Sequence, residues 1–170
     1  MKKLALLLVL SVSTLFTFAQ NKQITLEDIW KNGTFRPDYV PGFQSMPASD
    51  CYTMISRSGI DKHQFSTGEL VNTLMKSTRL TELSKGKLSI RDIDEYYFDE
   101  KEQKIMLATQ QEMIYRRSSK AFFYVYDITK DTLLLVADTA KGKQSFATFS
   151  PLGDKVAFVR NNNLFITDLN

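Results

Sequence analysis

The sequence has 170 residues, with 22 Lys and Arg residues against 19 Asp and Glu residues, one cysteine and one histidine. The charge is nearly balanced and no block of basic residues occurs, which argues against a nucleic-acid partner. A single cysteine, Cys51, leaves no internal disulfide. A single histidine, His63, without a cysteine cluster cannot form a familiar zinc site. We therefore expect no metal and no cofactor.

Residues 1–19 have the three parts of a secretory signal peptide. Lys2 and Lys3 form a positive start, the stretch from 4 to 10 is unbroken apolar, and Thr17 and Ala19 are small residues at the −3 and −1 positions before Gln20. The apolar stretch is shorter than the roughly 20 residues that span a bilayer, so a membrane anchor is the weaker alternative. We predict an exported protein, periplasmic or secreted, with no membrane anchor after cleavage.

Residues 20–45 are expected to form a short helix followed by an extended segment. Thr25 can cap a helix while Asp28, three residues later, reaches back to it as in a capping box. Gly33 then ends the helix, which is predicted from about Ile24 to Thr34. The prolines at 37 and 41 favour extended and turn conformations, because proline lacks a backbone donor and biases the residue before it.

From residue 46 onward the pattern is that of strands. The segments are short, rich in β-branched and aromatic residues, and bounded by turn residues. Cys51 is expected to be a small buried residue in one of them, with a reactive thiol as the alternative. The stretch 70–83 is left open between strand and helix, and no helix longer than the first is expected. The clearest strands are 105–108, 121–126, 132–136, 156–159 and 164–166.

Two segments repeat one pattern of an aromatic residue, a polar turn and a strand. Phe98 precedes the strand that begins at Ile105, and Phe149 precedes the strand that begins at Val156. The interval is seven residues in both copies, and the copies are offset by 51 residues. Each copy continues to a second strand that ends in an aspartate. This regularity indicates β-propeller blades, which recur at roughly 40–50 residues, rather than two hairpins of an unrelated sandwich.

The predicted fold is therefore all-β, a partial β-propeller over 46–170 with a short N-terminal helix. A weaker copy of the pattern runs from Met46 to Glu69, which brings the number of blades to two or three. The sequence stops at Asn170, after the third strand of a blade, and a protein ending there would leave strand edges unpaired. We interpret the sequence as a truncated chain or a gene fragment.

The two copies differ by one insertion. The first copy takes 29 residues from its aromatic residue to its aspartate, and the second takes 19. The ten extra residues fall within Thr109–Lys120, between the second and third strands of the blade. Repeat proteins often place functional residues in an insertion confined to one loop.

This insertion and its flanking strands resemble the propeller of dipeptidyl peptidase IV-like serine peptidases of the prolyl oligopeptidase family, in their bacterial exported form. The resemblance covers essentially all of the sequence after the signal peptide. The aromatic-Arg-basic-Ser hairpin is its most specific part. The segments that carry it are 24–29, 115–118, 124–127 and 149–165.

The resemblance implies a parent enzyme with an eight-bladed propeller and an α/β-hydrolase domain, which removes X-Pro or X-Ala dipeptides from peptides with free N-termini. It also implies a possible homodimer. Arg116 matches the arginine that hydrogen-bonds a substrate carbonyl in the family. The hairpin taken alone suggests instead a solvated charge or a salt bridge with Glu112. Arg117, treated as its strand neighbour, is expected to point the other way.

The catalytic parts of the family have no match in this sequence. No Gly-x-Ser-x-Gly nucleophile elbow occurs, the family's paired glutamates lie in a later blade, and His63 does not match the catalytic histidine. We expect this chain to contribute substrate-gating propeller blades and to be inactive by itself. The alternative function is a non-enzymatic periplasmic propeller that serves as a binding scaffold.

Overall fold

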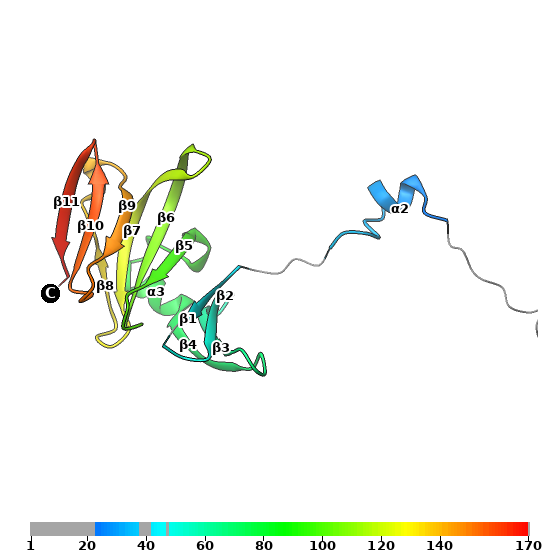
Figure 1. Ribbon diagram of the computed structural model, residues 1–170, viewed down its shortest axis with the longest axis horizontal. Coiled ribbons are helices and arrows are strands. Elements are labelled where there is room, and N and C mark those ends of the chain that lie inside the picture. Colours follow the sequence, from blue (N-terminus) through cyan, green and yellow to red (C-terminus); the bar gives the residue numbers. More distant parts are fainter. Residues whose placement is uncertain (1–22, 38–41, 47, 170) are drawn as a thin grey trace, which may run out of the picture. The chain divides into compact units, whose positions relative to one another are not determined.

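The computed structural model describes residues 23–37, 42–46 and 48–169 (Figure 1). The predicted signal peptide lies outside the described residues. The chain divides into two compact units, residues 1–40 and residues 41–170, and each is described by itself.

The first unit contains the predicted helix, α2 (Leu26–Trp30). Its capping box is present, because the Thr25 hydroxyl accepts from the Asp28 amide at 3.1 Å and the Asp28 carboxylate accepts from the Thr25 amide at 3.3 Å. The helix has five residues and ends before Gly33, whose φ is +61°. It is therefore shorter than the predicted span of 24–34, because turns occupy the residues after Trp30.

The second unit consists of three antiparallel sheets, in each of which strands that follow one another in sequence lie side by side (Figure 1). The first and second sheets have four strands each and the third has three. This is the predicted all-β, partial-propeller arrangement. The first sheet holds β1 (Phe43–Met46), β2 (Cys51–Ile55), β3 (Gly59–Gln64) and β4 (Leu70–Lys76). The second holds β5 (Ile93–Phe98), β6 (Lys104–Tyr115), β7 (Ser118–Asp127) and β8 (Thr132–Leu135), and the third β9 (Ser145–Phe149), β10 (Lys155–Arg160) and β11 (Asn163–Asp168).

The sequence repeat corresponds to the same turn in two sheets. β5 ends at Phe98 and β9 ends at Phe149, and the next residue closes the turn in both copies. Asp99 accepts from the Lys104 amide at 2.8 Å, and Ser150 accepts from the Lys155 amide at 3.1 Å. Both copies of the repeat therefore have a short polar side chain directly after the aromatic residue, and this side chain closes the turn.

The stretch 70–83, left open by the sequence, forms both a strand and a helix. β4 is followed by α3 (Ser77–Leu83), which has seven residues. The expectation that no helix exceeds the first is therefore wrong. Leu80 of α3 is completely buried, and Arg79 donates to Asp131 at 2.8 Å. Contacts with the second sheet, rather than local propensity, stabilise this helix. Two short 3₁₀ turns, Ile90–Asp92 and Thr139–Lys141, lie in the connections that precede β5 and β9.

The core has two parts, which lie on the two faces of the second sheet. Side chains of β6 alternate between them: Ile105 and Leu107 pack toward the first sheet, and Met106 and Ala108 toward the third. All four are at most 2% exposed. A strand buried on both faces reads as a continuous apolar run, as this one does in the sequence.

Hydrogen bonds also join neighbouring sheets. Thr53 and Tyr96 share a buried hydroxyl–hydroxyl contact of 3.0 Å between the first and second sheets. The Thr167 hydroxyl donates to the Val136 carbonyl at 2.9 Å between the third and second. These contacts, together with the two apolar cores, fix how the three sheets pack.

Candidate functional site

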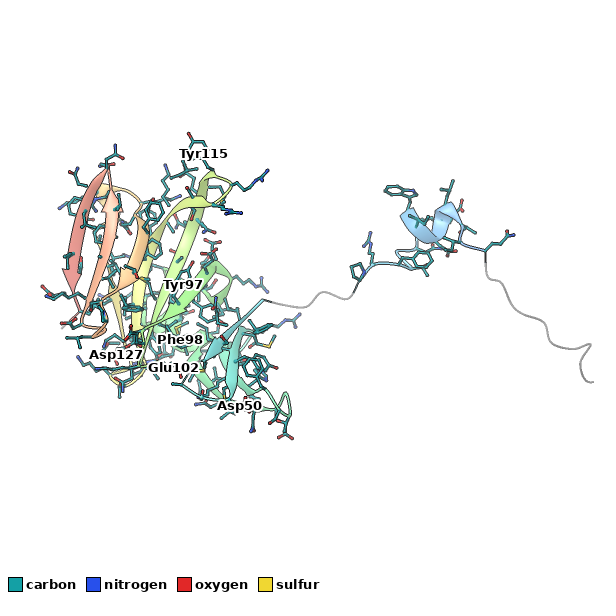
Figure 2. All side chains as sticks on the ribbon, viewed as in Figure 1. Asp50, Tyr97, Phe98, Glu102, Tyr115 and Asp127 are labelled. Atoms are coloured by element: carbon teal, nitrogen blue, oxygen red, sulfur yellow. The ribbon has the colours of Figure 1, made fainter. Side chains whose placement is uncertain are left out.

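The site is built on the β6–β7 hairpin, which is longer than its counterpart in the third sheet. β6 has 12 residues and β7 has ten, whereas β10 and β11 have six each. The predicted ten-residue insertion therefore lengthens both arms of one hairpin. Tyr115 lies at its tip, at the opposite end of the sheet from Phe98 (Figure 2).

Arg116 and Arg117 form the two-residue turn at this tip, between Tyr115 and Ser118, which pair with each other. The expectation that the two arginines are neighbours within a strand is therefore wrong, because β6 ends before them. Both are exposed. Arg116 makes no hydrogen bond or ion pair within the described part of the chain.

The salt bridge between Arg116 and Glu112, suggested by the hairpin alone, does not form. One carboxylate oxygen of Glu112 lies 3.0 Å from the ammonium of Lys120, and the other lies 3.3 Å from that of Lys143. These two lysines, Lys120 first, hold the pKa of the Glu112 carboxyl below its usual value. Glu112 thus pairs with lysines instead of Arg116, and the Arg116 donors, which have no partner among the described residues, are free for a ligand.

The segment 143–145, which leads into β9 and includes its first residue, attaches the hairpin to the third sheet at three points. Lys143 reaches Glu112, as above. Gln144, which is completely buried, exchanges two backbone hydrogen bonds of 2.9 and 2.8 Å with Ala121. The Ser145 hydroxyl donates to the Ser119 carbonyl at 3.0 Å. The arms of the hairpin are thereby held by the next sheet while its tip stays open to solvent.

Acid is expected to loosen the hairpin arms. Because the folded pKa of Glu112 is lowered from 4.5, its stabilising effect is present above that pH and is lost as the pH falls through the lowered pKa. We expect amide protection factors over 112–120 to fall about two- to fivefold between about pH 6 and pH 3, as an exposed ion pair allows. Hydrogen exchange, corrected for intrinsic rates, measures this.

Glu112→Gln is the control for this acid effect. It should abolish the pH dependence over 112–120 while leaving the amides of β2 and β3 unchanged. A pH dependence that persists in Glu112→Gln would show that another group is responsible.

A cavity of about 150 Å³ lies below the turn, between the hairpin, β5 and β9. Arg117 lines it and Arg116 does not. Glu95 and Tyr97 of β5, the strand paired with β6, also line the cavity, and the Tyr97 hydroxyl donates to the Glu95 carboxylate. Burial and this carboxylate raise the pKa of Tyr97 to about 12. Nothing in the sequence marked Glu95 or Tyr97, since they line the same cavity as Arg117 only because β5 pairs with β6.

The other two candidate side chains from the sequence are His63 and Cys51. The imidazole of His63 stacks on Tyr52 at 5.3 Å between ring centroids, and its Nδ1 lies 3.1 Å from the Gly68 carbonyl. No hydrogen bond joins His63 to a serine, threonine or cysteine among the described residues. Cys51 is a free thiol, half-buried in β2. A Ser-His-Asp triad within this sequence would require His63, because it is the only histidine.

Two further properties concern the described residues alone. They contain no group of three or more His, Cys, Asp or Glu side chains placed to hold a metal ion. No helix among them is long and apolar enough to cross a membrane.

Four-stranded antiparallel sheets in consecutive order, stacked face to face, define part of a β-propeller. Residues 99–170 match the family described as the dipeptidyl peptidase IV (DPP IV) N-terminal region. The structure is similar to that of Porphyromonas gingivalis dipeptidyl peptidase 4, with a TM-score of 0.69 and 31% identity over 87% of this chain. Residues 99–170 therefore match the N-terminal region of dipeptidyl peptidase IV, and the three sheets match part of its N-terminal propeller, as the sequence predicted.

Curated relatives match a shorter segment of the chain. A probable dipeptidyl-aminopeptidase B of Tuber melanosporum is 40% identical over 67 residues, which are 39% of this chain and 7% of the relative. A probable dipeptidyl peptidase 4 of Emericella nidulans is 42% identical over 62 residues, which are 36% of this chain and 8% of the relative. The solved P. gingivalis chain is matched over 20% of its length. The chain thus spans a small part of the proteins it resembles.

Proposed function

We propose that this chain forms the substrate-gating propeller blades of an exported serine exopeptidase that removes X-Pro or X-Ala dipeptides from peptide N-termini. In this proposal the chain itself carries no catalytic triad, and Arg116 contacts the substrate. The family match and the similarity to P. gingivalis dipeptidyl peptidase 4 support the reaction class. The signal-peptide pattern of residues 1–19 supports export to the periplasm or beyond.

The observation that carries the proposal is the state of Arg116. It sits at the tip of the inserted hairpin, it is exposed, and the nearby carboxylate of Glu112 is already occupied by two lysines. A guanidinium is charged at every physiological pH and presents its donors in a fixed plane, which suits hydrogen bonding to a peptide carbonyl. The 143–145 segment holds the hairpin arms, so the arginine is presented from a supported base.

The proposed partners are peptides with free N-termini and, for the complete enzyme, a second copy of itself. A propeller that narrows access to a catalytic chamber would admit short or unstructured peptides and exclude folded proteins. The scaffold alternative shares the propeller but provides no reason for an unpaired arginine on a single lengthened hairpin.

The purified 170-residue chain is expected to release no chromophore from a Gly-Pro reporter, whereas the complete protein, with this chain as its N-terminal part, should release it. The reason is that the chain lacks a nucleophile elbow. A serine-reactive fluorophosphonate should label the complete protein and leave the chain unlabelled. If the folded complete protein neither cleaves the reporter nor takes up the label, the proposal fails and the scaffold function is favoured.

A further inference from the structure

The cavity beneath the arginine turn has walls of opposite charge. Glu95 stands on the β5 side and Arg117 on the hairpin side, and both line the same space of about 150 Å³. The two do not form an ion pair with each other, and Arg117 has no hydrogen-bonding partner among the described residues. Each charge is therefore available to a ligand placed between them.

The carboxylate wall is fixed by its neighbour. The Tyr97 hydroxyl donates to Glu95, and with a pKa raised to about 12 the phenol stays protonated at every physiological pH. This hydroxyl donates to one oxygen of the Glu95 carboxylate and thereby fixes the orientation of the whole group. A carboxylate has about four acceptor sites, so one such bond leaves room for a ligand ammonium.

The floor of the cavity is apolar. Ala108 and Phe123, at 1% and 8% exposure, belong to the core between the second and third sheets, and Ala147 of β9 packs against that core. Near the turn, Gln111 donates from its side-chain amide to Ser119 at 2.9 Å, which leaves its carbonyl oxygen as an acceptor. The cavity thus offers an apolar surface between an anion and a cation.

Size and charge narrow the class of ligand. A volume of about 150 Å³ equals roughly five waters and is well below the roughly 300–1,000 Å³ of pockets for drug-sized ligands. A phosphate or another simple anion would be repelled by Glu95, and a metal cation by Arg117. A small molecule with separate positive and negative ends satisfies both walls.

We propose that this cavity binds a small zwitterion, an α-amino acid or dipeptide with an apolar side chain. Its ammonium would donate to Glu95 and to the Gln111 carbonyl, and its carboxylate would accept two parallel hydrogen bonds from Arg117. The apolar side chain would lie against Phe123 and Ala147. Arginine favours such paired bonds because its fork matches carboxylate geometry.

The test is a titration of the full chain, isotopically labelled, with glycyl-proline, followed by amide NMR. We expect saturable shifts at residues 95–97, 117–119 and 146–147 with a Kd on the order of 1 mM, as suits a ligand of this size held by two charges. Arg117→Ala and Glu95→Gln should each weaken binding about tenfold or more, since each removes a hydrogen bond to a charged group. Arg57→Ala, which changes an exposed arginine that does not line the cavity, should alter Kd by less than about twofold.

A second ligand isolates the role of the charges. N-acetyl-glycyl-prolinamide has the same apolar body without either charge and should give no saturable shift. Equal binding of this neutral ligand, equal loss in Arg57→Ala and Arg117→Ala, or no saturable shift with glycyl-proline up to tens of millimolar would each overturn the proposal. All three arginine and glutamate sites are exposed, and thermal melts check that the variants fold. No step of the test depends on peptidase activity, so its failure leaves the proposed function standing.

Discussion

Replacing Arg116 with alanine in the complete enzyme is expected to lower kcat/KM by about tenfold to a few hundredfold. In the proposed function, the change would remove a charge-assisted hydrogen bond to the substrate carbonyl, and such bonds contribute roughly 1.5–3 kcal/mol. Thermal stability should not change, because Arg116 is exposed and makes no hydrogen bond or ion pair within the described residues. Steady-state kinetics on a Gly-Pro reporter, with thermal melts of each variant, measure the effect.

Two variants serve as controls for this result. Arg116→Lys should recover only part of the loss, since it keeps the charge but not the planar fork. Arg117→Ala should cost much less, because Arg117 lines the cavity under the turn whereas Arg116 does not. A silent Arg116→Ala, or an Arg117→Ala that is equally damaging, would contradict the assignment of Arg116 even within the right family.

Replacing Gly59 with alanine is expected to destabilise the chain by about 3–5 kcal/mol. Gly59 begins β3 opposite Lys76, with a φ of +150°. A Cβ at this position would lie 1.9 Å from the carbonyl oxygen of Met75. The obstacle is backbone within a paired strand, which cannot move without breaking the β3–β4 ladder. Urea denaturation of the chain measures the free energy of unfolding.

Gly68→Ala is the matched control for Gly59→Ala. Gly68 also has a positive φ, +71°, but no atom lies within 4 Å of its added Cβ. This variant should cost only the conformational strain of about 1–2 kcal/mol. If the two variants lose the same stability, strain rather than the close contact at Met75 governs Gly59.

The sequence predicted those parts of the fold that depend on local chemistry. The spacing of Phe98 and Phe149 identified equivalent turns, because a polar residue after each aromatic closes the turn through backbone amides. The Thr25 cap was predicted for the same reason, since its partner lies three residues away. Such contacts are short in sequence and so leave a visible pattern.

Features that depend on packing between sheets were not predictable. Ser77–Leu83 forms a helix because Leu80 is buried between the first and second sheets, while its serine and threonine content favours neither state. The insertion gave no indication of where the β6–β7 strands would end. The two arginines were therefore treated as strand neighbours rather than as a turn.

The candidate site was also predicted only in part. Arg116 could be singled out because the insertion interrupts a repeat, and resemblance then suggested its role. Glu95 and Tyr97 could not, because they lie some 20 residues before the turn and share a cavity with Arg117 only once β5 has paired with β6. The attachment by the 143–145 segment was equally hidden, since it joins residues of adjacent sheets.

The consecutive order of the strands has a consequence for the nascent chain. Within each sheet every strand pairs with the one before it in the sequence, so each sheet is built from segments that leave the ribosome one after another. The first sheet can therefore form as soon as β4 leaves the ribosome, but Ile60 and Met75 stay uncovered until β6 emerges and packs on them. At about 5–20 residues per second, that exposure lasts about two to eight seconds. During this interval the apolar face of the first sheet is the surface that a chaperone would be expected to recognise.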